Sequence, residues 1–157
     1  MTVPRRFDGA DCWRISGVRS AEEFFRAVSR LIPEATHMFL EGAPVPDIVA
    51  LIEPSAEQTE YGAPVGTIWS WPRRNQRFTL RASPALFARL SEAAAHHAEP
   101  EICSHLHLYR EGDPLLHWFD AFDCPVLVSK VVPRERVERF CTEVGGVLSD
   151  EGNRQHG

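Results

Sequence analysis

Residues 104–122 read SHLHLYREGDPLLHWFDAF, and this stretch predicts a β-hairpin. The runs 104–110 and 115–122 are rich in aromatic and apolar residues, and they flank the polar segment 111–114. Gly, Asp and Pro favour the backbone of tight turns, so this segment is expected to be the loop of the hairpin. Because the strands of a hairpin run antiparallel, the sheet of this protein is expected to be mainly antiparallel.

Capping residues place expected helices on both sides of this hairpin. Ser20 begins one with a capping box, and Ser83 begins another because a proline follows it. A third is expected from Pro133 to the glycine pair 145–146, and a short one over 46–52. Further strands are expected at 12–15, 36–40, 65–71, 76–82 and 126–132.

The order of these elements lacks the regular strand-helix-strand alternation of a doubly wound fold. We therefore expect an α+β fold, with a single domain over residues 1–148 in which a mainly antiparallel sheet has about three helices packed on one face. The polar residues 149–157 are expected to form a disordered tail. A chain of 157 residues, 43% hydrophobic and 25% charged, has the ordinary composition of one such domain.

The sequence favours a cytoplasmic location without membrane insertion. No stretch approaches the roughly 18 apolar residues that a membrane helix needs, and the first twelve residues lack the apolar core of a secretory signal. The cysteines at positions 12, 103, 124 and 141 are far apart and form no C-x-x-C pair. This spacing excludes a zinc ribbon and a thioredoxin-type motif. Without an export signal, the cysteines are expected to be reduced thiols.

The net charge of −5 is distributed unevenly along the chain. Residues 31–72 carry six acidic side chains and no Lys or Arg, whereas residues 73–89 carry five Arg and no acid. An acidic chain is repelled by phosphate backbones, so nucleic-acid binding would have to depend on the one basic segment. The charge therefore disfavours a nucleic-acid partner.

Histidines are concentrated beside the predicted hairpin. Five of the seven lie between residues 96 and 117: His96, His97, His105, His107 and His117. On a strand, His105 and His107 point to the same face with Cα atoms about 6.6 Å apart, and two imidazoles at this spacing could hold a divalent metal, zinc or iron.

The third metal ligand depends on the hairpin register. A loop of two or four residues would place Asp120 opposite His105, which gives two histidines and a carboxylate. A three-residue loop would place His117 opposite His107, which gives three histidines. The alternative is that these histidines bind neighbouring protein groups and no metal, which is the commoner arrangement on half-buried strands and the one we favour.

The segment His105 to Glu111 resembles part of the first cupin motif, in which a Glu follows the second His by four residues. The resemblance covers seven residues only. Glu99 stands where that motif has glycine, and the second cupin motif is missing. We do not assign the chain to that family.

An aromatic and basic segment follows the acidic one. Its candidate anion-binding residues are Trp69, Trp71, Arg73, Arg74 and Arg77, with Arg81 as an extension. Guanidinium groups would hold phosphate or carboxylate, and the indoles could stack on a base or ring. The favoured alternative is a solvated turn whose arginines balance the neighbouring acidic segments.

The run after the hairpin carries two carboxylates, Asp120 and Asp123. On a regular strand they face opposite sides, so they do not form an acid-base dyad unless a bulge intervenes. We expect Trp118 or Phe119 in the core and Asp123 in the turn before Cys124-Pro125.

Three functional hypotheses follow, in this order. The first is a non-catalytic binding or regulatory domain that contacts a protein partner through an acidic surface. The second is a metal-dependent enzyme with the His-x-His site, in which Arg73, Arg74 or Arg77 orients a small anionic substrate. The third is nucleic-acid binding through residues 69–81.

Overall fold

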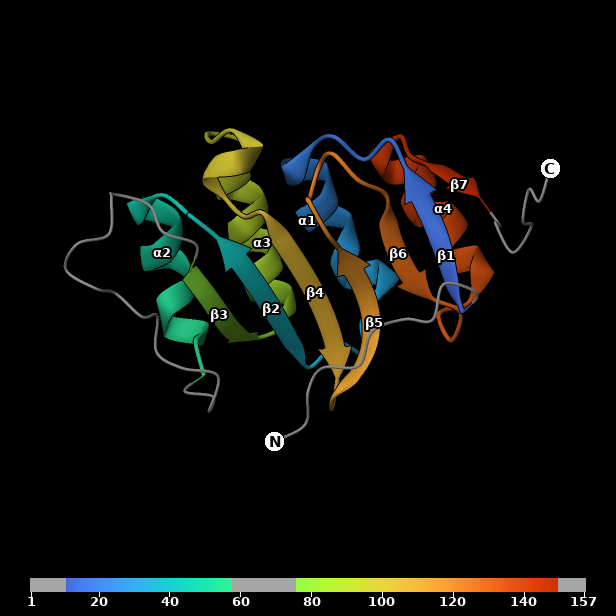
Figure 1. Cartoon of the computed structure of the whole chain (residues 1–157), viewed down its shortest axis with the longest axis horizontal. Helices are drawn as coiled ribbons and strands as arrows, with labels where there is room; N and C mark the ends of the chain where they lie inside the picture. The colour runs from blue at the N-terminus through green and yellow to red at the C-terminus, as the bar shows by residue number, and fades with distance from the viewer. Residues whose placement is uncertain (1–10, 58–75, 150–157) are drawn as a thin grey trace.

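The computed structural model describes residues 11–57 and 76–149, and a seven-stranded sheet forms its frame (Figure 1). The strands are β1 (Cys12–Ser16), β2 (His37–Gly42), β3 (Gln76–Arg81), β4 (His105–Arg110), β5 (Asp113–Trp118), β6 (Val126–Ser129) and β7 (Val147–Ser149). They lie in the order β3-β2-β4-β5-β6-β1-β7, and every neighbouring pair is antiparallel. The α+β class and the antiparallel sheet are thus confirmed.

In the described residues four α-helices accompany this sheet, at the places of the three long helices and the short one that the sequence predicts. They are α1 (Ala21–Leu31), α2 (Pro46–Ile52), α3 (Pro84–Ala94) and α4 (Arg134–Val144), with short 3-10 turns η1 (Glu53–Ser55) and η2 (Glu99–Glu101). The hydroxyl oxygens of Ser20 and Ser83 accept hydrogen bonds from backbone amides at the starts of α1 and α3, as predicted. Gly145 ends α4 in the left-handed conformation.

The hydrophobic core lies between the sheet and the helices. Figure 1 shows α1, α3 and α4 behind the sheet, and α2 beside β3. Alternate strand residues point to these helices and are fully buried, among them Met38, Leu40, Leu106, Leu108, Leu116 and Trp118. Trp118 packs on Phe24 of α1 with ring centroids 4.6 Å apart, so the expected burial of Trp118 is confirmed.

The opposite face of the sheet carries a continuous row of paired residues. The row crosses all seven strands and consists of Thr79, Phe39, His107, His117, Leu127, Arg14 and Ser149, each the partner of the next. We call it the histidine row. Since side chains alternate along a strand, these residues point away from the helices.

A β-bulge sets the register of the hairpin. The loop has two residues, Glu111 and Gly112, and Arg110 pairs with Asp113. Leu115 is then an extra residue, so that beyond it His107 pairs with His117. The pairing expected for a three-residue loop is therefore present, but a two-residue loop and a bulge produce it.

The register with Asp120 opposite His105 is wrong, because β5 ends at Trp118 and the chain turns there. The second strand of the hairpin is correspondingly shorter than the expected 115–122 segment. Similarly, β6 ends at Ser129 rather than at residue 132.

The two ends of the domain also differ from expectation in small ways. Strand β7 was not predicted, and Ser149, expected in the tail, pairs with Arg14 of β1. The rest of the expected tail and the expected strand 65–71 lie outside the described residues. Within the part of the chain that the structure describes, no helix has the length and apolar character needed to cross a membrane.

Candidate functional site

A cleft of about 1010 Å³ opens at one end of the sheet, where β1 ends, β4 begins and β5 has just ended. Three segments line it: 16–19 between β1 and α1, 99–104 around η2, and 120–125 between β5 and β6. These segments are far apart in the sequence. The fold brings them together, because β1 and β5 end, and β4 begins, at the same end of the sheet (Figure 1).

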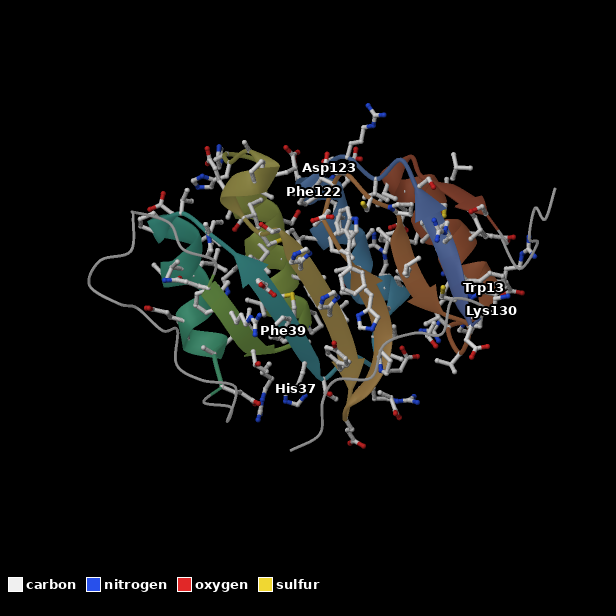
Figure 2. All side chains as sticks on the ribbon, in the orientation of Figure 1. Trp13, His37, Phe39, Phe122, Asp123 and Lys130 are labelled. Carbon is white, nitrogen blue, oxygen red and sulfur yellow. The ribbon has the colours of Figure 1, made fainter. Side chains whose placement is uncertain are left out.

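The turn at 120–125 has an unusual backbone. Asp120 and Phe122 have φ angles of 44° and 77°, in the left-handed region that non-glycine residues rarely adopt. The amides of Asp123 and Cys124 both donate to the carbonyl oxygen of Asp120 at 3.0 Å. This compact turn presents the side chains of Asp120 and Asp123 to solvent, and Figure 2 shows Phe122 and Asp123 at this end of the sheet.

Trp118 anchors the turn in the core. Its indole Nε1 donates to the carbonyl oxygen of Cys124 at 2.8 Å. The Phe122 ring packs against the indole, with centroids 4.4 Å apart. Backbone strain of this kind persists only where surrounding contacts hold it, and these two contacts do so.

Two further hydrogen bonds join the turn to β4. The amide of Ala121 donates to the carbonyl oxygen of Ser104 at 2.8 Å. The amide of Asp120 donates to Nδ1 of His105 at 3.0 Å. His105 therefore positions the turn, and the backbone that carries its two acidic side chains, Asp120 and Asp123, is held by hydrogen bonds.

The charged lining of the cleft is mainly acidic. Glu99, Asp120 and Asp123 contribute three carboxylates, and Arg19 contributes one guanidinium. Asp120, Asp123 and Arg19 are exposed, and Glu99 is half-buried. Among the residues that the structure describes, none forms an ion pair with any of these three carboxylates.

Two thiols line the cleft at different depths. Cys124 is exposed on the turn, whereas Cys103 is buried. Burial raises the pKa of the Cys103 thiol to about 12, so this group stays protonated at neutral pH. Cys124 is thus the accessible sulfur of the cleft.

The metal candidates of the sequence do not form one cluster. His107 and His117 are paired on neighbouring strands, with their rings nearly perpendicular and their Nδ1 atoms 2.9 Å apart. Nδ1 of His105 accepts a hydrogen bond from the amide of Asp120. Over residues 11–57 and 76–149, no group of three or more His, Cys, Asp or Glu is placed to hold a metal ion.

Aromatic rings surround the His107–His117 pair. The Phe119 ring centroid lies 4.8 Å from that of His107 and 5.6 Å from that of His117. Phe39 stacks on His107 at 5.9 Å, and Tyr109 meets His117 at 5.8 Å. His107 is 8% exposed and His117 is 2% exposed, so the pair is a buried polar element on the face opposite the helices.

Four of the five anion-binding candidates, Trp69, Trp71, Arg73 and Arg74, lie outside the described residues. The fifth, Arg77, lies 3.6 Å from a carboxylate oxygen of Glu41 on β2. Arg81 donates twice to Glu57, at 3.1 and 3.2 Å. The two described arginines of the segment therefore both lie beside acidic side chains.

Glu57 also accepts from His37, whose Nε2 lies 2.9 Å from the carboxylate. Although burial works to raise it, hydrogen bonds from Arg81 and His37 hold the pKa of Glu57 below its usual value. This network fixes the chain after η1 to the edge of β2 and β3.

Sequence reasoning missed Arg19 and Glu99. The only local signal near Arg19 is Gly17, which has a φ of 80° between β1 and α1 and which the sequence places between a predicted strand and a predicted helix. Nothing in the sequence around Glu99 points to a site.

Comparisons with known proteins found no match: no family model fits the chain, and no curated protein and no solved structure is similar to it. The functional conclusion therefore rests on the geometry of the cleft.

Proposed function

We propose that this protein is a non-catalytic binding domain that takes a basic segment of a protein partner into the cleft at the end of its sheet. The observation that carries the proposal is the lining, in which three carboxylates without described ion-pair partners stand beside a single guanidinium. A lysine or arginine side chain of the partner would supply the positive charge that forms ion pairs with these carboxylates.

The size of the cleft supports a peptide segment as the ligand. Small-molecule pockets commonly enclose about 300–1,000 Å³. The cleft reaches about 1010 Å³ and is open to solvent on its acidic rim. It therefore has room for more than one side chain of a bound segment.

The rigid turn supports binding in a second way. Asp120 and Asp123 are held by the hydrogen bonds within the turn and by the anchor at Trp118. Because little freedom remains to be lost when a ligand binds, less of the interaction free energy is spent on ordering the protein. An arginine of the partner could bind a carboxylate through two parallel hydrogen bonds.

The charge predicts how affinity and rate respond to salt. Exposed ion pairs contribute about 0.2–1 kcal/mol each, and they accelerate encounter more than they strengthen the complex. Binding should therefore weaken as ionic strength rises. We also place this function in the cytoplasm, a reducing compartment suited to the exposed thiol of Cys124.

The enzyme and nucleic-acid hypotheses have less support in the described residues. Arg77, the substrate-orienting candidate that is described, lies beside Glu41. Arg81 donates to Glu57, and the other arginines and tryptophans of both hypotheses lie outside the described residues.

The test is a titration with two labelled peptides, one of alternating Arg and Gly and one of alternating Glu and Gly. Fluorescence anisotropy at low ionic strength should show saturable binding of the arginine peptide alone. The variant Asp120→Asn/Asp123→Asn should weaken it about tenfold, because two exposed ion pairs are lost. Asn also tolerates the left-handed backbone of position 120, so the turn is kept.

The matched control is Asp113→Asn at the start of β5. It removes one carboxylate from an exposed turn at the opposite end of β4 and β5. Its affinity for the arginine peptide should stay within about twofold of wild type, since an exposed charge far from the ligand is screened. Equal losses in the control and the cleft variant, or no saturable binding, would overturn the proposal.

A further inference from the structure

The imidazole of His105 accepts a hydrogen bond from a backbone amide, and this contact fixes the position of the ring proton. The amide nitrogen of Asp120 lies 3.0 Å from Nδ1 of His105. A backbone N–H can only donate, so Nδ1 presents a lone pair and the neutral ring carries its proton on Nε2. An imidazolium has a proton on both nitrogens and accepts no hydrogen bond. Protonation of His105 and its bond to the amide of Asp120 therefore exclude each other.

Uptake of a proton by Nδ1 would turn this attraction into a repulsion. The new N–H bond of the ring and the N–H bond of Asp120 would point at each other across 3.0 Å. Two donors in this position repel each other, so the ring or the turn has to move. The proton comes from water and returns to water when the pH rises again, so the change is reversible.

The turn at 120–125 is built to respond to the loss of this bond. Its backbone is strained, with φ angles of 44° at Asp120 and 77° at Phe122. The bond to His105 and the bond from the amide of Ala121 to the carbonyl oxygen of Ser104 join it to β4. Strained backbone persists only where the surrounding contacts hold it. When the first of these two bonds is lost, the end of the turn that carries Asp120 should loosen.

Acidic groups outnumber basic groups around this ring. Near His105 the described ionisable side chains on this sheet face are Glu41 of β2, Arg77 of β3, His107 of β4 and His117 of β5, and the turn adds Asp120 and Asp123. Three carboxylates thus stand beside one guanidinium, which lies 3.6 Å from Glu41. These fixed charges attract an imidazolium more than they repel it. The two other histidines can change charge in the same pH range, so the experiment has to follow each ring separately.

We propose that His105 is a pH-sensitive switch that releases the turn at 120–125 from β4 when its ring takes up a proton. Histidine is the side chain that ordinarily changes charge between about pH 5 and pH 8. Carboxylates ordinarily stay ionised over this range, so acidification would move Asp120 while leaving the charge of the cleft in place. The release of the turn is independent of the proposed function, and only its effect on peptide affinity rests on that function.

The first test follows the full wild-type chain by nuclear magnetic resonance between about pH 7.5 and about pH 5.5. At the higher pH, the ring nitrogen signals of His105 should show a proton on Nε2 alone. As this ring takes up its second proton, the protection of the Asp120 amide against hydrogen exchange should fall about threefold or more, after correction for the pH dependence of free amides.

Two results of this measurement would overturn the proposal. One is an Asp120 amide that keeps its protection while the His105 ring is protonated. The other is a proton on Nδ1 of His105 at the higher pH, because the ring could not then accept from the amide. Since wild-type protein is used, neither result depends on the folding of a variant.

Two substitutions at this position separate the acceptor from its titration. His105→Asn places an amide oxygen near the position of Nδ1, where it can accept from Asp120 but takes up no proton in this pH range. Protection of the Asp120 amide should then be independent of pH. His105→Phe removes the acceptor and should give low protection at both pH values. His96→Gln is the control, because it changes an exposed histidine beyond α3 and should keep the wild-type pH response. A wild-type pH response in His105→Asn would reject His105 as the switch.

The arginine peptide measures the consequence for the cleft. Wild type should bind it about threefold or more weakly at about pH 5.5 than at about pH 7.5, whereas His105→Asn should bind it equally at both. Arginine keeps its charge throughout, so the peptide itself does not titrate. If the peptide binds at neither pH, the proposed function fails and the amide measurement still decides the switch. Equal wild-type affinity at both pH values, with the turn released, would reject the link between His105 and the cleft.

Discussion

Trp118 and Cys124 are joined across the turn that follows β5, where the indole Nε1 donates to the carbonyl oxygen of Cys124 at 2.8 Å. A side chain of the core thereby fixes the backbone beneath Asp123. We therefore expect the stability of the core and the proposed peptide affinity of the cleft to be linked at this one bond.

Trp118→Phe should lower both the free energy of unfolding and the affinity for the arginine peptide. The variant leaves the carbonyl of Cys124 without its donor and removes part of a fully buried ring. The free energy of unfolding should fall by about 1–3 kcal/mol, measured by urea denaturation. The arginine peptide should also bind more weakly, because the turn loses its anchor.

Trp13→Phe is the control for this prediction. Its indole Nε1 donates to the carbonyl oxygen of Val132 at 3.1 Å, in a region that does not line the cleft. Trp13→Phe should have a lower free energy of unfolding than wild type and should bind the arginine peptide with unchanged affinity. Equal peptide binding by wild type and Trp118→Phe would contradict the linkage.

Gly42→Ala should destabilise the fold through a steric clash with the cleft segment. A Cβ at position 42 would lie 2.6 Å from the amide nitrogen of Ser104. That amide donates to the carbonyl oxygen of Glu41 at 2.8 Å, so the clash also strains a hydrogen bond. We expect a loss of about 1–3 kcal/mol in unfolding free energy and weaker binding of the arginine peptide.

Gly112→Ala separates this effect from backbone strain. Position 112 has a φ of 90° and open space around its Cβ. In Gly112→Ala the free energy of unfolding should fall by about 1–2 kcal/mol through backbone strain alone, and the affinity for the arginine peptide should be unchanged. A loss of peptide affinity in Gly112→Ala would count against a local effect at Ser104.

Cys124 should react first with a thiol reagent. It is exposed, whereas burial raises the pKa of Cys103 to about 12 and also raises the pKa of Cys141. Brief treatment with iodoacetamide at neutral pH, followed by peptide mapping by mass spectrometry, should find the adduct at position 124.

The same adduct should also obstruct the cleft. Because Cys124 lines it, the modified protein should bind the arginine peptide more weakly than untreated protein. A Cys124→Ser variant given the same treatment should keep its affinity. First reaction at Cys103 would refute the assigned burial.

Glu57→Gln should destabilise the fold in a pH-dependent way. The folded-state pKa of Glu57 lies below the ordinary value of 4.5, so its ion pairs stabilise the protein above that pH and lose this effect as the pH falls through the folded-state pKa. The variant should lose less than about 1 kcal/mol at pH 7, and the difference should vanish at strongly acidic pH.

Glu53→Gln is the control, because no described ion pair includes Glu53. Urea denaturation at both pH values should give nearly the wild-type stability. If Glu57→Gln is equally destabilising at both pH values, the ion pairs are not the cause.

Features set by nearby residues could be predicted from the sequence. The caps at Ser20 and Ser83 bond to amides three residues later, so the sequence alone contains both partners. The glycine pair after α4 is equally local, and so is the hairpin turn, although its loop is residues 111–112 and not the expected 111–114. The α+β class follows from the order of such elements.

Features set by distant contacts could not be predicted. Strand β7 exists because Ser149 meets Arg14, and its three residues carry little pattern of their own. The cleft likewise needs Arg19, Glu99 and Asp123 to converge at one edge of the sheet. Only the strand order determines that convergence, and local periodicity does not encode strand order.

The bulge at Leu115 decides which of two neighbouring side chains enters the core. If Leu115 paired with Leu108 in place of bulging, the pairing begun by Arg110 and Asp113 would continue unshifted, and His117 would face the helices while Trp118 faced away from them. Such a one-residue slip would place an imidazole where the core has the indole of Trp118, and the histidine pair and the anchor of the cleft would be lost together. Deletion of Leu115 would instead leave Leu116, His117 and Trp118 opposite their present partners.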